Sequence, residues 1–190
     1  NDMMQKIISS AVLVFGLGTG VQAENLGTLI EGDLRPGWRL ASGEHVAALH
    51  LTLAPGWKTY WRAPGDAGIP PLFNWSGSTN AERVTVNWPT PKVFDQSGMR
   101  SIGYSKEVVL PIYIAPNSAG DIELNGEMQL GLCKDICLPH TIHFKGTLPG
   151  SEKRADPVIA SALAALPYDS NEASVKSVKC KIAPAQGGLS

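Results

Sequence analysis

Residues 122–144 read IELNGEMQLGLCKDICLPHTIHF, and this stretch decides the fold that the sequence predicts. Apolar side chains alternate with polar ones on both sides of a cysteine pair, at Ile122, Leu124, Met128, Leu130, Leu138, Ile142 and Phe144. An alternation of period two is typical of strands with one buried face. The stretch therefore predicts two strands joined by a three-residue turn, residues 134–136, with Cys133 and Cys137 on its two flanks.

Directly paired positions of an antiparallel hairpin lie close enough for a disulfide. In the chain-entropy model a five-residue loop contributes only about 2 kcal/mol, against roughly 3.5 kcal/mol for a 25-residue loop. A bridge on a turn is also exposed, and exposure favours thiol–disulfide exchange. A reactive pair is therefore the favoured interpretation of Cys133 and Cys137, and a hairpin disulfide without chemistry stays open as the alternative.

Short apolar runs continue along the chain in both directions from this hairpin. Fourteen prolines and twenty glycines interrupt them, which favours a β-rich fold over a helical one. Strands are predicted at residues 26–30, 46–53, 57–61, 72–75, 83–88, 107–115, 121–132 and 140–148, with a loop at 63–71. Short strands at this spacing, without helices between them, predict an all-β fold, an immunoglobulin-like antiparallel β-sandwich.

The pattern changes after Gly150. Asp156 and Pro157 form an N-cap and N1 pair, which predicts a short C-terminal helix over residues 158–166. Residues 174–182 alternate again and predict the start of a second β-module. The expected organisation is a signal peptide at 1–23, a redox domain at 24–150, a helix and linker at 151–173, and the truncated start of that module at 174–190.

The N-terminal residues predict export. Lys6 precedes an apolar run at residues 7–17, and the small residues Val21 and Ala23 suit cleavage before Glu24. A retained N-terminal anchor is the alternative, although the run is shorter than the roughly 20 apolar residues of a membrane span. No other segment could span a membrane, so the mature chain is expected to be soluble. The net charge of −1 gives no electrostatic footprint for nucleic acid.

Several segments together resemble the N-terminal periplasmic domain of the DsbD/ScsB family of thiol:disulfide interchange proteins. The resemblance covers roughly residues 26–167 and is closer to ScsB. It is carried by residues 56–71 (GWKTYWRAPGDAGIPP), 73–76 (FNWS), 88–89 (WP), 94–104, 108–112 (VVLPI) and 133–139 (CKDICLP). The tryptophan-rich segment and the cysteine pair are fairly specific for this family when they occur together.

The resemblance implies an immunoglobulin-like domain that carries reducing equivalents across the periplasm without a bound cofactor or metal. Cys133 and Cys137 would be its redox pair, with Cys137 forming the mixed disulfide with partners. Residues 94–104 match the family's cap loop, in which Phe94 and Met99 are the candidate shielding side chains. The implied partners are thioredoxin-like periplasmic proteins and a membrane-embedded electron donor of DsbD/ScsB type. Cys180 would lie in the next module and pair beyond this chain.

The spacing departs from DsbD proper, which has more residues between its cysteines. Lys134 and His140 could stabilise a thiolate, whereas Asp135 would oppose it. We interpret Lys134 and Asp135 first as a polar turn, and His45 and His50 as surface residues.

Two other classes of function remain as alternatives. A Cys-x-x-x-Cys-x-Pro segment resembles Sco-type copper chaperones, and His140, His143 and Met99 could complete a soft metal site for copper binding or copper tolerance. Against this, Cys137 and His143 would lie about 20 Å apart along a strand. A non-catalytic binding sandwich could instead use exposed tryptophans, with Trp57 and Trp61 as candidates and Trp88 in the core.

Overall fold

The computed structural model describes residues 29–96, 98–180, 184–185 and 188–189. The predicted signal peptide lies outside these residues. The strands are β1 (Ile30–Arg39), β2 (His45–Leu53), β3 (Lys58–Gly65), β4 (Leu72–Asn74), β5 (Arg83–Val86), β6 (Lys92–Gln96), β7 (Met99–Ser105), β8 (Glu107–Ala115), β9 (Ile122–Cys133), β10 (Cys137–Leu148), β11 (Pro184–Ala185) and β12 (Gly188–Leu189). One helix, α1 (Pro157–Ala164), lies between β10 and β11.

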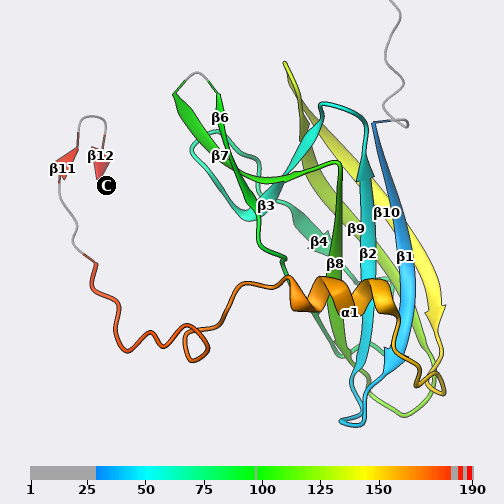
Figure 1. Cartoon of the computed structure of the whole chain (residues 1–190). Coiled ribbons are helices and arrows are strands. Elements are labelled where there is room, and N and C mark those ends of the chain that lie inside the picture. The colour runs from blue at the N-terminus through cyan, green and yellow to red at the C-terminus, as the bar shows by residue number, and fades with distance from the viewer. Residues whose placement is uncertain (1–28, 97, 181–183, 186–187, 190) are drawn as a thin grey trace, which may run out of the picture.

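Two antiparallel sheets form the body of the protein (Figure 1). One has the order β1-β2-β8-β5, and the other has the order β10-β9-β3-β7-β6, with β4 also paired to β9. Gly32 of β1 lies against the side chain of Ile142 of β10, so the first strand of one sheet meets the edge of the other. The predicted immunoglobulin-like sandwich is therefore confirmed.

The alternation seen in the sequence explains how the core forms. Leu49 and Leu51 of β2, Leu110 and Ile112 of β8, and Leu124 of β9 are each at most 1% exposed. Because successive side chains of a strand point to opposite faces, these positions bring the two sheets together around one apolar layer.

Helix α1 covers the outer face of the sheet that contains β2 (Figure 1). Ile159 is fully buried there against Val46 and Ala48. The Asp156 side chain accepts hydrogen bonds from the backbone N–H groups of Val158 and Ile159, which confirms the predicted N-cap. Among the described residues, no helix has the length and hydropathy that a membrane span requires.

The structure differs from the predicted strands in several places. Strand β1 continues through residues 31–39, where no strand was predicted, and residues 26–28 of the predicted strand lie outside the described part. Strand β3 extends to Gly65, into the predicted loop. Residues 92–105 form the β6–β7 hairpin, for which no strand was predicted. Residues 175–180 are neither helix nor strand, so the prediction of a strand at 174–182 was wrong for these residues.

His45 also differs from its predicted position on the surface. The residue is fully buried, its Nε2–H donates to the carbonyl oxygen of Pro36 at 2.6 Å, and its Nδ1 accepts from Arg39 Nε at 3.4 Å. Sequence alternation could not reveal this, because the ring's partner, the Pro36 carbonyl oxygen, lies in the irregular part of β1 between Arg35 and Trp38.

Candidate functional site

The two cysteines close the β9–β10 hairpin. Cys133 is the last residue of β9 and Cys137 the first of β10, and they are direct partners in the register of the two strands. A disulfide joins them, with Cα atoms 4.1 Å apart. The backbone N–H of Lys134 donates to the carbonyl oxygen of Ile136 at 3.0 Å within the connecting turn. The predicted turn and the pairing of its flanking cysteines are thus present.

The two sulfur-bearing residues differ sharply in exposure. Cys133 is 1% exposed, whereas Cys137 is exposed at the start of β10. An external thiol or disulfide can therefore reach Cys137 but not Cys133. This asymmetry fits thiol–disulfide exchange, in which one sulfur of the pair meets the partner and the other acts within the protein.

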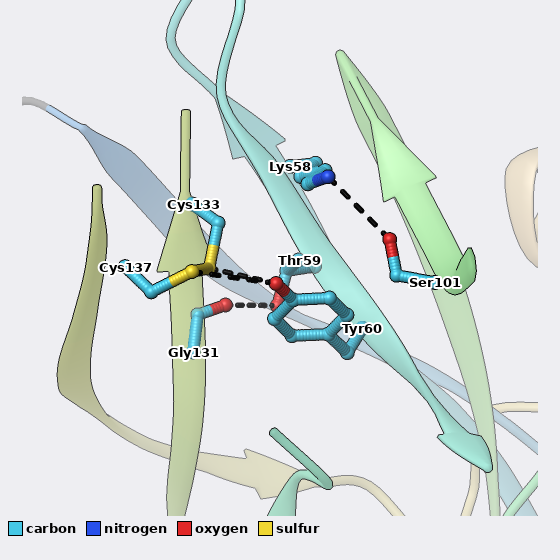
Figure 2. The surroundings of a disulfide bond; sticks show 7 residues. All are labelled: Lys58, Thr59, Tyr60, Ser101, Gly131, Cys133 and Cys137. Carbon is cyan, nitrogen blue, oxygen red and sulfur yellow. Dashed lines mark hydrogen bonds between the residues drawn. A yellow bond between two sulfur atoms is a disulfide. The ribbon is translucent and has the colours of Figure 1, made fainter. Parts of the chain in front are cut away.

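Strand β3 supplies the buried side of the site (Figure 2). Lys58 pairs with Cys133 in register, and the Thr59 hydroxyl donates to the carbonyl oxygen of Gly131 at 3.0 Å. The Tyr60 hydroxyl donates to Cys133 Sγ at 2.8 Å and lies 3.5 Å from Cys137 Sγ. Burial raises the pKa of Tyr60, so its hydroxyl stays protonated and remains a hydrogen-bond donor at neutral pH.

A shallow hollow of about 280 Å³ opens beside Cys133 on the solvent side. It is lined by Gly56, Lys58, Phe94, Asp95, Cys133, Lys134 and Asp135. Two lysines and two aspartates thus line the hollow together with Cys133, so groups of both charges lie on this side of the site. The sequence interpretation of Lys134 and Asp135 as residues of a polar turn agrees with their exposure.

The two candidate shielding residues lie on the same hairpin in different surroundings. Phe94, on β6, is half-buried and lines the hollow, and its ring centroid is 5.2 Å from Lys58 Nζ. Met99, on β7, is 52% exposed and is not among the residues that line the hollow. The family-matched segment 94–104 therefore brings Phe94 to the cysteines.

The residues of the copper alternative do not gather around the cysteines. His143 is exposed and lies 3.9 Å from Glu127, and His140 pairs with Leu130, three residues along β10 from Cys137. Within the described residues, no group of three or more His, Cys, Asp or Glu side chains could hold a metal ion.

The tryptophans of the binding-sandwich alternative pack inward. Trp57 is 3% exposed, contrary to its predicted exposure, and Trp61 is half-buried against the core with Arg62 stacked over its ring. Trp88 packs against the core edge-on to Phe73, as predicted.

Tyr60 is the functional candidate that sequence analysis missed. It stands in the tryptophan-rich segment of the resemblance, but the alternation of β3 alone does not say which strand lies beside it. The contact follows from the pairing of Lys58 with Cys133, which joins segments 75 positions apart in the chain.

Comparison with known proteins agrees with this geometry. A search of curated protein sequences found no match. Among solved structures, the N-terminal periplasmic domain of ScsB from Proteus mirabilis matches with 32% identity and a TM-score of 0.54, over 73% of this chain. This chain spans about half, 53%, of that structure's length. The reduced N-terminal domain of Neisseria meningitidis DsbD matches with 14% identity and a TM-score of 0.41, over 63% of this chain and 88% of the other.

A family model also matches the chain. Residues 32–149, which include both sheets and both cysteines of the disulfide, match the family described as "Thiol:disulfide interchange protein DsbD, N-terminal". With its sandwich, its hairpin disulfide and this match, the chain belongs to the family of DsbD N-terminal domains and is a thiol–disulfide interchange domain.

Proposed function

We propose that this domain works in the periplasm and passes reducing equivalents through Cys133 and Cys137, from a membrane-embedded donor to thioredoxin-like partner proteins. The observation that carries the proposal is the exposure of Cys137 beside the burial of Cys133 in one disulfide. The N-terminal periplasmic domain of ScsB, which is 32% identical to this chain, supports the compartment.

The reaction runs in two balanced exchanges. In the reduced protein, the Cys137 thiolate attacks a partner disulfide, forms a mixed disulfide and releases one partner thiolate. The Cys133 thiolate then attacks Cys137 Sγ, which closes the Cys133–Cys137 bond and releases the second partner thiolate. Two electrons pass to the partner, and a donor dithiol restores the reduced pair by the reverse sequence.

Exposed apolar side chains near Cys137 support a protein partner over a small molecule. Ile136, in the turn between the cysteines, is 63% exposed, and Ile69, which lies against Gly131, is 38% exposed. Apolar side chains around a reactive centre are typical of the core of a protein–protein contact.

A redox titration in glutathione buffers tests this proposal. The mature chain carries Cys180→Ser, because that exposed free thiol would otherwise react, and the oxidised fraction is read by thiol alkylation and mass. We expect a midpoint in the range of exchange-active pairs, roughly −120 to −270 mV. A midpoint below about −300 mV, together with slow exchange, would identify a structural bridge and overturn the proposal.

A further inference from the structure

The buried sulfur of the pair has a protein donor directed at it. Cys133 and Tyr60 are 1% and 2% exposed, so water has little access to the Cys133 side chain. The Tyr60 hydroxyl donates a hydrogen bond to Cys133 Sγ at 2.8 Å (Figure 2). A charge that forms on a buried atom is costly unless a hydrogen bond is made to it.

Such a charge forms in every turnover of the proposed exchange. When a donor thiolate attacks Cys137 Sγ, a bond forms between those two sulfurs and the Cys133–Cys137 bond breaks. The bonding electron pair stays on Cys133 Sγ, which leaves as a thiolate. In the opposite direction, the same thiolate is the nucleophile that releases the reduced partner.

We propose that Tyr60 is a catalytic residue of this exchange, whose hydroxyl stabilises the Cys133 thiolate as leaving group and as resolving nucleophile. The inference rests on the proposed function. It adds the Tyr60 hydroxyl as the group that allows the buried Cys133 to carry a negative charge during exchange. A hydrogen bond to an ionised acceptor is stronger than one to a neutral sulfur, so the contact strengthens as the disulfide opens.

The surroundings of Tyr60 fix its hydroxyl in this place. A Cβ atom at Gly68 would lie 2.9 Å from Tyr60 Cδ1, and one at Gly131 would lie 3.1 Å from Tyr60 Cε2. Two glycines therefore leave room for the ring on both sides. The pairing of Tyr60 with Gly103 on β7 fixes the backbone. This gives the loop after β3 a role in the site, because Gly68 belongs to it.

Tyr60 is not among the residues that line the hollow with the charged groups of the site. Lys58, Lys134, Asp95 and Asp135 line the solvent-side hollow, and Lys58 Nζ also lies 3.4 Å from Ser101 Oγ. A change of Tyr60 to phenylalanine leaves all four charges in place. The variant therefore isolates the hydroxyl from the electrostatic field of the hollow.

The experiment compares Tyr60→Phe with Tyr104→Phe, both in the Cys180→Ser chain. Tyr104 is a matched control, since it is also buried and its hydroxyl donates at 2.7 Å to the carbonyl oxygen of Pro89 and not to a sulfur. The first readout is the rate of disulfide reduction by dithiothreitol. The second is the pH at which the Cys133 thiol ionises in a Cys137→Ser background, followed by thiolate absorbance.

For Tyr60→Phe we expect reduction to slow roughly ten- to a hundredfold, the factor that one hydrogen bond to a charged group represents. Ionisation of Cys133 moves to higher pH, whereas Tyr104→Phe leaves both readouts near those of the parent. Gly68→Ala keeps the hydroxyl, but its methyl group would press on Pro64 and, at 2.9 Å, on Cδ1 of the Tyr60 ring, and we expect a smaller slowing in the same direction. If Tyr60→Phe does not fold, the reduction rate of Gly68→Ala tests the role of Tyr60 in its place, and an unchanged rate would count against that role.

The outcomes separate this inference from the proposed function. If the parent exchanges rapidly at a potential within the active range and Tyr60→Phe matches Tyr104→Phe in both readouts, the role of Tyr60 is overturned and the proposed function stands. If the parent has the potential of a structural bridge, the proposed function fails and the role of Tyr60 in exchange fails with it, whatever the Cys133 titration shows.

Discussion

The ammonium of Lys58 lies 5.2 Å from the centroid of the Phe94 ring, and this cation–π contact joins β3 to the β6–β7 hairpin at the disulfide. Both residues line the hollow beside Cys133. The hairpin that matches the family's cap loop is thus attached to the strand that carries Tyr60, and an attached hairpin can limit access to the sulfurs. We propose that Phe94 acts in this way.

Phe94→Ala should therefore speed the reduction of the disulfide. Loss of a partly exposed cation–π contact, about 0.5–1 kcal/mol, raises the population of the open hairpin roughly two- to fivefold. The measurement is the rate of reduction by glutathione at neutral pH. Val93→Ala is the control, because Val93 precedes Phe94 on β6 and is 63% exposed. Equal rates in the two variants would show that Phe94 does not shield the cysteines.

Single-cysteine variants should differ in reactivity as the two sulfurs differ in exposure. Cys133→Ser retains the exposed Cys137, which we expect to form mixed disulfides rapidly with a large aromatic disulfide reagent. Cys137→Ser retains the buried Cys133, which should react only when the hairpin opens and therefore much more slowly. The measurement is the time course of reagent release in the Cys180→Ser background. Faster reaction of Cys133 would reverse the proposed roles.

The sequence predicts the disulfide hairpin well because both of its strands show a strict alternation and the turn is short. The β6–β7 hairpin was missed since residues 92–105 contain few apolar side chains in alternation, and the hairpin is held by pairing with β3, far away in the chain. Tyr60 was missed for the same reason, because its role depends on a long-range pairing. The strand predicted near Val178 has apolar alternation, but none of the described strands pairs with residues 175–180, and Val178 is 79% exposed.

The buried His45 should make stability depend on pH. Burial lowers the pKa of His45 most, the charges of Arg39 and Lys153 lower it further, and the hydrogen bond to Pro36 opposes them. In the unfolded chain the imidazole takes up a proton near pH 6.5, whereas in the folded chain it does so only at lower pH. The contribution of His45 to the unfolding free energy is therefore complete above about pH 6.5. Below that pH the unfolding free energy falls, by at most about 1.4 kcal/mol per pH unit.

Urea unfolding at pH 7.5 and 5.5 measures this effect. We expect His45→Gln to show a smaller drop in the urea midpoint between these pH values than the parent, whatever its absolute stability. His50→Gln is the control, since His50 lies at the surface beside Glu107. A drop of the same size in the parent and in His45→Gln would assign the pH dependence to other groups.

Asp156 should stabilise the docking of α1 in two separable ways. Its Oδ1 caps the helix, while its Oδ2 accepts from Arg35 of β1 at 2.7 Å. Burial raises the pKa of Asp156, but the hydrogen bonds from Arg35, Val158 and Ile159 outweigh this and lower it overall. At pH 7 we expect Asp156→Ala to cost about 0.5–2 kcal/mol of unfolding free energy and Asp156→Asn to cost less, because asparagine also caps helices.

Because the folded-state pKa of Asp156 is lowered, the charge-dependent part of its contribution is present above the unfolded pKa, near 3.9, and is lost as the pH falls through the folded pKa. The difference in urea midpoint between the parent and Asp156→Asn should therefore shrink from pH 7 to pH 3. Asp33→Asn, at an exposed position on β1, serves as the control. If the difference between the parent and Asp156→Asn stayed constant over this range, the ion pair with Arg35 would contribute nothing to the stability of the fold.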